Sequence, residues 1–228
     1  VWQLNDCWPV TSWAALDLGT NAAGEPVARR KPLWYAVRSA YADRLVTLQR
    51  DADGWRAVLV NDGRDDWVAT GTVELRTLAG EVLWSRSLAR LVPLRSRVDV
   101  PLEPDTHGVT EAELALVVTL SDAERAVKLL VEDVAAAIPV PDYEAEVART
   151  DAGVTVEVTA RSFLRTLCIF PDRVAEDSVP DSLGIDLFPG ERHTFTVTGE
   201  VTDDALARLT TRPVLRSLTI PLTPSEAV

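Results

Sequence analysis

Methionine is absent from the sequence, although translation begins with one. Its absence predicts that these 228 residues are a piece of a longer protein. Long apolar runs are also lacking: stretches such as residues 114–120 are far shorter than the roughly 20 residues that cross a bilayer. The chain does not open with a charged and then apolar segment, as a signal peptide does. We therefore expect no membrane partner.

Cysteine and histidine are scarce, with two of each. Cys7 and Cys168 fall in different predicted domains and lack metal-ligand spacing, which argues against a disulfide framework and a zinc site. His107 and His193 lie far apart in turn-like sequence, so we expect surface histidines. The sequence thus predicts no metal and no cofactor. Two free thiols favour a reducing compartment, and we predict the cytoplasm of a bacterium.

Positive charge is in short supply, since 23 lysines and arginines face 35 aspartates and glutamates. With a net charge of −12, the chain cannot neutralise the phosphates of a nucleic acid and release their bound counterions. Nucleic acid is therefore excluded as a partner. Apolar residues make up 46% and charged residues 25%, which is the balance of a folded globular chain rather than of a disordered one.

The hydrophobic pattern divides the chain into a short mixed segment and a long β region. Residues 1–4 predict a strand, a loop follows, and residues 33–41 predict a helix whose apolar face is formed by Leu33, Ala36, Val37, Ala40 and Tyr41. That face must be covered by the neighbouring domain or by another copy of the chain. After about residue 44 the period changes to two and stays so.

The β region contains an internal duplication in which three pairs of segments recur about 100 residues apart. The pairs are residues 50–54 with 149–153, residues 91–100 with 187–197, and residues 114–120 with 214–220. This spacing predicts tandem immunoglobulin-like β-sandwiches. Residues 135–142 contain alternate prolines and predict a stiff linker between the copies.

Aromatic residues are few but concentrated in the first 35 positions, as Trp2, Trp8, Trp13, Trp34 and Tyr35. An indole offers a flat apolar face and one N–H donor, and nearby Asn and Asp side chains supply hydrogen bonds, which together suit a sugar. The alternative is that these rings fill a core. Trp55, Trp67 and Trp84, in strand-like sequence, are predicted to lie in the sandwich core.

The run from residue 2 to residue 13, W-Q-L-N-D-C-W-P-V-T-S-W, together with residues 31–38, resembles the end of the catalytic barrel in β-mannosidases of glycoside hydrolase family 2. Residues 186–191 are similar to the L-x-P-G-E signature of the last sandwich in that family. Residues 22–30 depart from the family pattern by making a longer, more charged approach to the helix.

The resemblance implies a mainly β chain in three parts. Residues 1–44 would be the last strand, loop and helix of a (β/α)8 barrel. Residues 45–138 and 139–228 would be the first and second immunoglobulin-like β-sandwiches. The missing N-terminal domains and the rest of the barrel would then be partners of this chain.

The resemblance also implies a retaining, exo-acting glycosidase that releases terminal β-linked mannose from a glycoside or oligosaccharide substrate. Its two catalytic glutamates would lie on earlier barrel strands, so this chain would hold no catalytic residue. Trp2 would be a platform beneath the sugar, Asn5 and Asp6 would brace the loop, and Trp8 would pack or line an outer subsite. The alternatives are another exo-glycosidase of the family, acting on galactosides or glucuronides, and a carbohydrate-binding accessory module.

Overall fold

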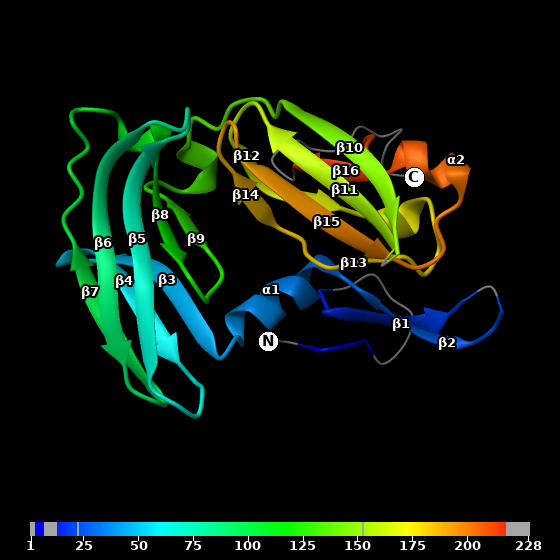
Figure 1. Ribbon diagram of the computed structural model, residues 1–228, viewed down its shortest axis with the longest axis horizontal. Helices are drawn as coiled ribbons and strands as arrows, with labels where there is room; N and C mark the ends of the chain where they lie inside the picture. Colours follow the sequence, from blue (N-terminus) through cyan, green and yellow to red (C-terminus); the bar gives the residue numbers. More distant parts are fainter. Residues whose placement is uncertain (1–2, 7–12, 22, 152, 218–228) are drawn as a thin grey trace. The chain divides into compact units, whose positions relative to one another are not determined.

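The computed structural model describes residues 3–6, 13–21, 23–151 and 153–217, and within them the chain is mainly β, as the sequence predicts (Figure 1). They form two compact units. One contains the described residues of 1–38 and 140–228, and the other is residues 39–139. No helix in the described ranges has the length and apolar character that spanning a membrane requires.

The unit of residues 39–139 is a sandwich of two antiparallel sheets. Its three-stranded sheet has the order β3-β4-β7 and its four-stranded sheet the order β6-β5-β8-β9. The strands are β3 (Arg44–Asp51), β4 (Gly54–Asn61), β5 (Trp67–Thr77), β6 (Val82–Val92), β7 (Ser96–Leu102), β8 (Leu114–Leu120) and β9 (Ala126–Leu129), with short 3-10 turns at Glu111–Glu113 and Asp133–Ala135.

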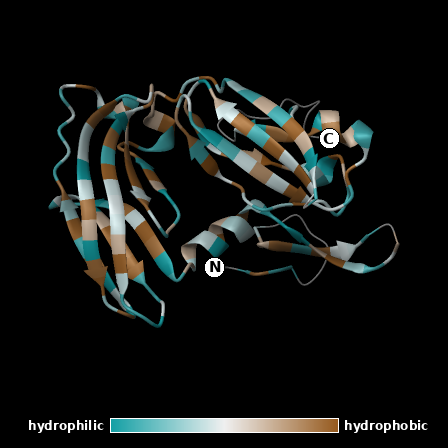
Figure 2. Cartoon of the chain, in the orientation of Figure 1, coloured by the Kyte–Doolittle hydropathy of each residue, from teal (hydrophilic) through white to brown (hydrophobic). Residues whose placement is uncertain are grey.

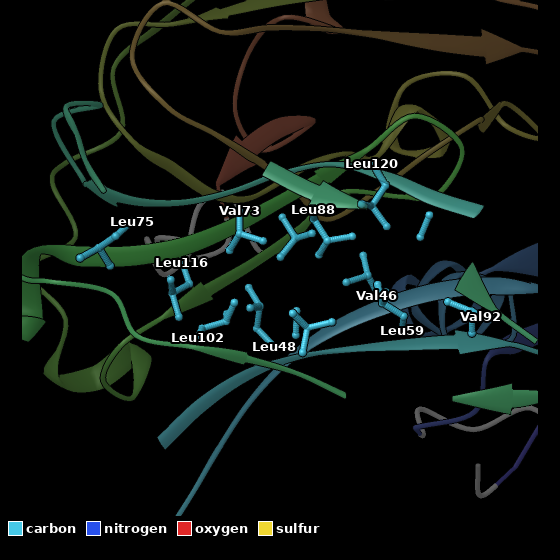
Figure 3. Close-up of a cluster of buried hydrophobic side chains, with 14 of the residues drawn as sticks. Val46, Leu48, Leu59, Val73, Leu75, Leu88, Val92, Leu102, Leu116 and Leu120 are labelled. Carbon is cyan, nitrogen blue, oxygen red and sulfur yellow. The ribbon is translucent and has the colours of Figure 1, made fainter. Parts of the chain in front are cut away.

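Alternation along these strands produces the core. Hydrophobic and hydrophilic residues alternate along most of the strands (Figure 2), so one face of each sheet is apolar. The side chains of Val46 and Leu48 gather with those of Val73 and Leu88 between the two sheets (Figure 3). Trp67 is fully buried in this core, and Trp55 and Trp84 pack against it while partly exposed. The predicted core location is confirmed for Trp67, whereas Trp55 and Trp84 lie at the margin of the core.

The second sandwich repeats the order of three strands in each sheet of the first, but its fourth strand, β13, joins the sheet that corresponds to β3-β4-β7, whereas β9 of the first joins the other sheet. The sheets of the second sandwich have the orders β10-β11-β15-β13 and β14-β12-β16. The elements are β10 (Tyr143–Thr150), β11 (Gly153–Ala160), β12 (Leu164–Ile169), a 3-10 turn at Pro171–Arg173, β13 (Val179–Pro180), β14 (Ile185–Leu187), β15 (Arg192–Thr198), α2 (Asp203–Arg208) and β16 (Leu215–Ser217). Cys168 lies buried in β12, where burial raises the pKa of its thiol to about 11.

The duplicated segments occupy equivalent places in the two sandwiches. Gly54 begins β4 with φ +111°, and Gly153 begins β11 with φ +129°, so each glycine closes the first hairpin of its copy. Both positions lie where L side chains are strained, which explains why glycine recurs there. The later pairs also correspond, since β7 matches β15 and β8 matches β16 in sheet order.

The L-x-P-G-E segment forms the tight turn before β15. The carboxylate of Glu191 accepts a hydrogen bond from the backbone N–H of Phe188 at 3.0 Å, and Gly190 has φ +84°. The Gly190 N–H donates to the carbonyl of Ala160 at 2.8 Å, and the ring of Phe188 lies 4.9 Å from that of Phe163. The motif therefore fixes a loop to the end of β11.

The first forty residues differ from the expected strand, loop and helix. The loop contains a hairpin of β1 (Leu16–Thr20) and β2 (Pro26–Arg30). Residues 1 and 2 lie outside the described residues, and Gln3 to Asn5 make only a single parallel bridge, Asn5 to Leu16, instead of a full strand. The sequence predicts a loop over these residues, and the structure replaces it by the hairpin. The helix, α1 (Pro32–Ala40), agrees with the prediction.

Two side-chain environments differ from the sequence prediction. The buried residue of α1 is Tyr35, whereas Ala36, Ala40 and Tyr41 of the expected apolar face are exposed. The ring of Tyr35 is buried and its hydroxyl bonds to Pro180, 145 residues away, so helical periodicity alone does not reveal which face of α1 is covered. His193 is not in a turn on the surface: it lies half-buried in β15, 3.0 Å from the Ser182 hydroxyl and against the ring of Phe195.

Alanine at the two duplicated glycines should destabilise the chain unequally. In Gly54→Ala nothing lies within 4 Å of the new Cβ, so the cost is the positive φ alone, about 1–2 kcal/mol. In Gly153→Ala the Cβ would lie 2.4 Å from the Val197 carbonyl oxygen, and overpacking adds about 1–3 kcal/mol. Calorimetric melting of both variants measures this difference. Equal losses would contradict it.

Candidate functional site

The candidate site is the N-terminal segment of the unit that contains residues 140–228. The carbonyl oxygens of Gln3 and Leu4 accept hydrogen bonds from the N–H groups of Ala15 and Leu16 at 3.2 and 2.8 Å. The N–H of Lys31 donates to the Ala15 carbonyl at 3.0 Å. These bonds place the residues that precede α1 beside residues 3–6. The side chains of Lys31 and Asp6, 25 positions apart, therefore meet.

Asp6 is the buried charged residue of this segment, with a side chain only 6% exposed. One carboxylate oxygen accepts a hydrogen bond from the Gln3 amide at 3.2 Å, and the other lies 3.4 Å from the Lys31 ammonium. The Asn5 amide donates to the backbone carbonyl of Asp6 at 3.0 Å. A buried carboxylate with a cation and a donor beside it is stabilised in its charged form. This arrangement holds the chain in place.

Aromatic and guanidinium groups stack around α1, contributed by the helix and by the end of β2. The guanidinium of Arg30 lies 4.2 Å from the centre of the Trp34 ring, and that of Arg38 lies 5.3 Å from it. Trp34 meets Tyr35 edge to face, with ring centres 5.0 Å apart. Such contacts hold the indole in one orientation, because cation–π and edge-to-face pairs are each worth about 0.5–1.5 kcal/mol.

Tyr35 joins this segment to the C-terminal sandwich. Its side chain is buried, and its hydroxyl donates a hydrogen bond to the carbonyl of Pro180 at 2.9 Å. Burial raises the pKa of the Tyr35 hydroxyl, against the opposing effect of Arg30 and Arg38. The phenol therefore keeps its proton, and with it the hydrogen bond, to higher pH than an exposed tyrosine does.

Two further contacts accompany Tyr35. The Arg38 guanidinium donates to the carbonyl of Asp181 at 2.8 Å, and Arg29 of β2 forms an ion pair with Glu176 at 2.9 Å. Beside them a pocket of about 390 Å³ lies between the hairpin, the start of α1 and the segments around Phe170 and Ser178. The N-terminal segment is thus packed against the sandwich that lies farther along the sequence.

The structure brings together two of the four predicted site residues. Asn5 and Asp6 are adjacent and joined by the Asn5 amide, whereas Trp2 and Trp8 lie outside the described residues. Trp13, from the same motif, has 69% of its surface exposed. In the described part of the chain, no group of three His, Cys, Asp or Glu side chains could hold a metal ion.

Sequence reasoning did not identify Tyr35 as a contact residue or the hairpin before it. The turn of the hairpin had a readable signal, because the Asn21 side chain accepts hydrogen bonds from the N–H groups of Ala23 and Glu25, and Gly24 has φ +79°. Asparagine followed three positions later by glycine is a turn pattern. No local pattern indicated the partner of Tyr35, since Pro180 is 145 residues away.

Two solved glycosidases share the fold of this chain. A β-D-mannosidase from Dictyoglomus thermophilum superposes with a TM-score of 0.73 over 95% of this chain and 26% of its own, at 17% sequence identity. An exo-chitosanase from Amycolatopsis orientalis gives a TM-score of 0.57 over 90% of this chain and 28% of its own, at 16% identity. No protein-family model matches the chain.

Curated relatives of the chain are β-mannosidases. β-Mannosidase B of Aspergillus niger is 27% identical over 90% of this chain, and that of Aspergillus oryzae is 28% identical over 90%. The chain spans about a quarter of each of these relatives, 26% of their length. In sequence and in fold, the chain resembles β-mannosidases.

Removing the Tyr35 hydroxyl should loosen the N-terminal segment. In Tyr35→Phe the buried Pro180 carbonyl loses its donor, and we expect a loss of about 1–3 kcal/mol in the free energy of unfolding. Tyr41→Phe is the matched control, since Tyr41 is 73% exposed and should change stability by less than about 0.5 kcal/mol. Urea denaturation of both variants measures these changes.

The same pair of variants tests the raised pKa. An unfolded tyrosine ionises near pH 10, before the buried Tyr35 does, so ionisation favours unfolding as the pH rises above about 10. The difference in stability between the parent chain and Tyr35→Phe should therefore shrink above that pH. A difference that stays constant from pH 8 to pH 11 would contradict this interpretation.

Proposed function

We propose that this chain is the C-terminal part of a retaining, exo-acting β-mannosidase, an enzyme that hydrolyses terminal β-linked mannose. The observation that carries the proposal is the agreement of two independent comparisons. The sequence matches β-mannosidase B along 90% of its length, and the fold matches a solved β-mannosidase over 95%. The missing N-terminal domains and barrel are the expected partners, and the substrate is a mannoside or manno-oligosaccharide.

In this proposal residues 1–44 are the last strand, loop and helix of a (β/α)8 barrel, and residues 45–138 and 139–228 are the two sandwiches. Exposed apolar side chains support it. Leu4 is 57% and Leu18 48% exposed. Large apolar side chains grouped in one short segment are typical of a surface that another part of a protein covers, and the rest of a barrel would cover this one.

In this proposal the substrate-binding residues have the roles that the resemblance to family 2 β-mannosidases implies. Trp2 is the platform beneath the sugar, and Trp8 lines an outer subsite or packs. Asn5 and Asp6 brace the loop, and the support is that the Asp6 carboxylate is held by Gln3 and Lys31. A retaining mechanism needs two carboxylates about 5–5.5 Å apart. We propose that both lie in the missing barrel.

A second sugar specificity has one observation in its favour. The exo-chitosanase of Amycolatopsis orientalis shares the fold over 90% of this chain, although its TM-score is lower than that of the β-mannosidase. Another exo-glycosidase of this type is thus the alternative. The curated relatives come from fungi, which gives no support to a bacterial source, and a cytoplasmic location stays a prediction.

The 228-residue chain by itself should hydrolyse nothing. We expect background release of nitrophenol from p-nitrophenyl β-mannoside by this chain, and turnover by the longer protein that contains it. In the longer protein Trp2→Ala should lower kcat/KM by about 10–1,000-fold, or roughly 1.4–4 kcal/mol of transition-state stabilisation. The β-glucosaminide and β-galactoside serve as specificity controls.

Two results would overturn the proposal. If the longer protein prefers the β-glucosaminide or β-galactoside, the sugar assignment is wrong. If the 228-residue chain turns over the mannoside and Asp6→Ala abolishes that activity, a catalytic carboxylate lies in this chain and the placement of the active site is wrong.

A further inference from the structure

A cleft of about 600 Å³ lies in the unit of residues 39–139, between the β3–β4 hairpin and the end of β9. Gln49, Arg50 and Trp55 line it on the hairpin side, and Lys128 and Glu132 on the other. Its volume falls within the range of about 300–1,000 Å³ that small-molecule pockets occupy.

Trp55 is the aromatic wall of the cleft. It shares the inward face of β4 with Ala57 and Leu59, which are both fully buried, but Trp55 itself is only partly buried. Its indole N–H has no hydrogen-bond partner among the residues that the structure describes. A partly exposed indole with a free donor offers both an apolar surface and a polar edge to a ligand.

Arg50 stands across the hairpin from Trp55, with its guanidinium 5.5 Å from the centre of the indole ring. The same guanidinium contacts the carboxylate of Glu111 at 3.2 and 3.3 Å. Its charge is therefore compensated within the protein. Arg50 orients the indole and does not leave an unpaired cation at the cleft.

The remaining polar groups are open to a ligand. Neither the Lys128 ammonium nor the Glu132 carboxylate forms a hydrogen bond or an ion pair within the described part of the chain. Gln49 is not one of these groups, because its side chain lies with Thr47 on the opposite face of β3, where the amide donates to the Thr47 hydroxyl at 3.2 Å. The cleft thus presents donors and acceptors around an indole, which is the combination that hydroxyl groups on a C–H framework need.

Charge decides among ligand classes. The Lys128 and Glu132 charges are opposite, and Arg50 is paired with Glu111, so the lining is close to neutral. The chain as a whole carries −12, which disfavours phosphate-containing and acidic polymers. A neutral polyhydroxylated ligand needs no unpaired charge in the cleft, and the negative charge of the chain does not repel it.

We propose that this cleft binds a neutral oligosaccharide, with the exposed part of Trp55 against a sugar ring and Lys128 and Glu132 on its hydroxyls. The site is a binding site without hydrolysis. Only the choice of β-mannan pieces as the first probe rests on the proposed function, because the cleft itself selects for neutral sugars.

The test is calorimetric titration of the 228-residue chain with β-1,4-mannohexaose and with cellohexaose, and with sorbitol as a monomeric polyol control. We expect saturable binding of at least one hexaose and none of sorbitol. The double variant Lys128→Ala with Glu132→Ala should weaken binding by about 10-fold, and Trp55→Leu by at least as much. Trp84→Leu is the matched control, because Trp84 packs partly exposed against the same core without lining the cleft.

The surface double variant keeps the test decisive if Trp55→Leu fails to fold, because both of its side chains lie outside the core. Absence of binding by both hexaoses up to 10 mM (about −2.7 kcal/mol) would overturn the proposal. Binding that is unchanged in the double variant, or lost equally in Trp84→Leu, would also overturn it. Hydrolysis is measured separately, so failure here leaves the proposed β-mannosidase activity untouched.

Discussion

The hydroxyl of Tyr35 donates a hydrogen bond to the carbonyl of Pro180, a residue 145 positions later, and the tyrosine ring is buried where the two segments meet. This contact determines where the N-terminal segment lies. Arg38 and Arg29 add polar contacts to Asp181 and Glu176 on either side. Because α1 follows the hairpin directly, holding Tyr35 also places the hairpin, and with it the Lys31 ammonium that meets Asp6. A segment that cannot form a core by itself is ordered by the last sandwich.

The sandwiches were predictable from the sequence because their determinants are local. Alternation of apolar residues specifies which face of a strand is buried, and glycines at positive φ, such as Gly54 and Gly153, specify where a hairpin closes. The N-terminal segment was less predictable because its determinants are distant. Neither the burial of Tyr35 nor the exposure of Tyr41 follows from helical periodicity when the surface that receives the helix comes from residues near 180.

In the candidate site, too, part of the arrangement was predictable from the sequence and part was not. Asn5 and Asp6 were identified from the sequence as bracing residues, and the structure gives Asp6 two polar neighbours, Gln3 and Lys31, that hold its carboxylate. A carboxylate so engaged is poorly suited to attack a sugar or to protonate a leaving group, since both tasks need a free oxygen and a carboxylate partner. We therefore propose that the chemistry of the parent enzyme belongs to residues beyond this chain, and that the chain contributes support and, at Trp55, a separate polar cleft.

The central claim is that the N-terminal segment is structurally part of the C-terminal sandwich and not of the sandwich that follows it in sequence. Its most direct test is calorimetry of the chain with and without residues 1–38. We predict that the deletion lowers the melting temperature of the transition that belongs to residues 140–228 and leaves that of residues 39–139 unchanged. A deletion that leaves both transitions unchanged, or that lowers only the transition of residues 39–139, would contradict the account.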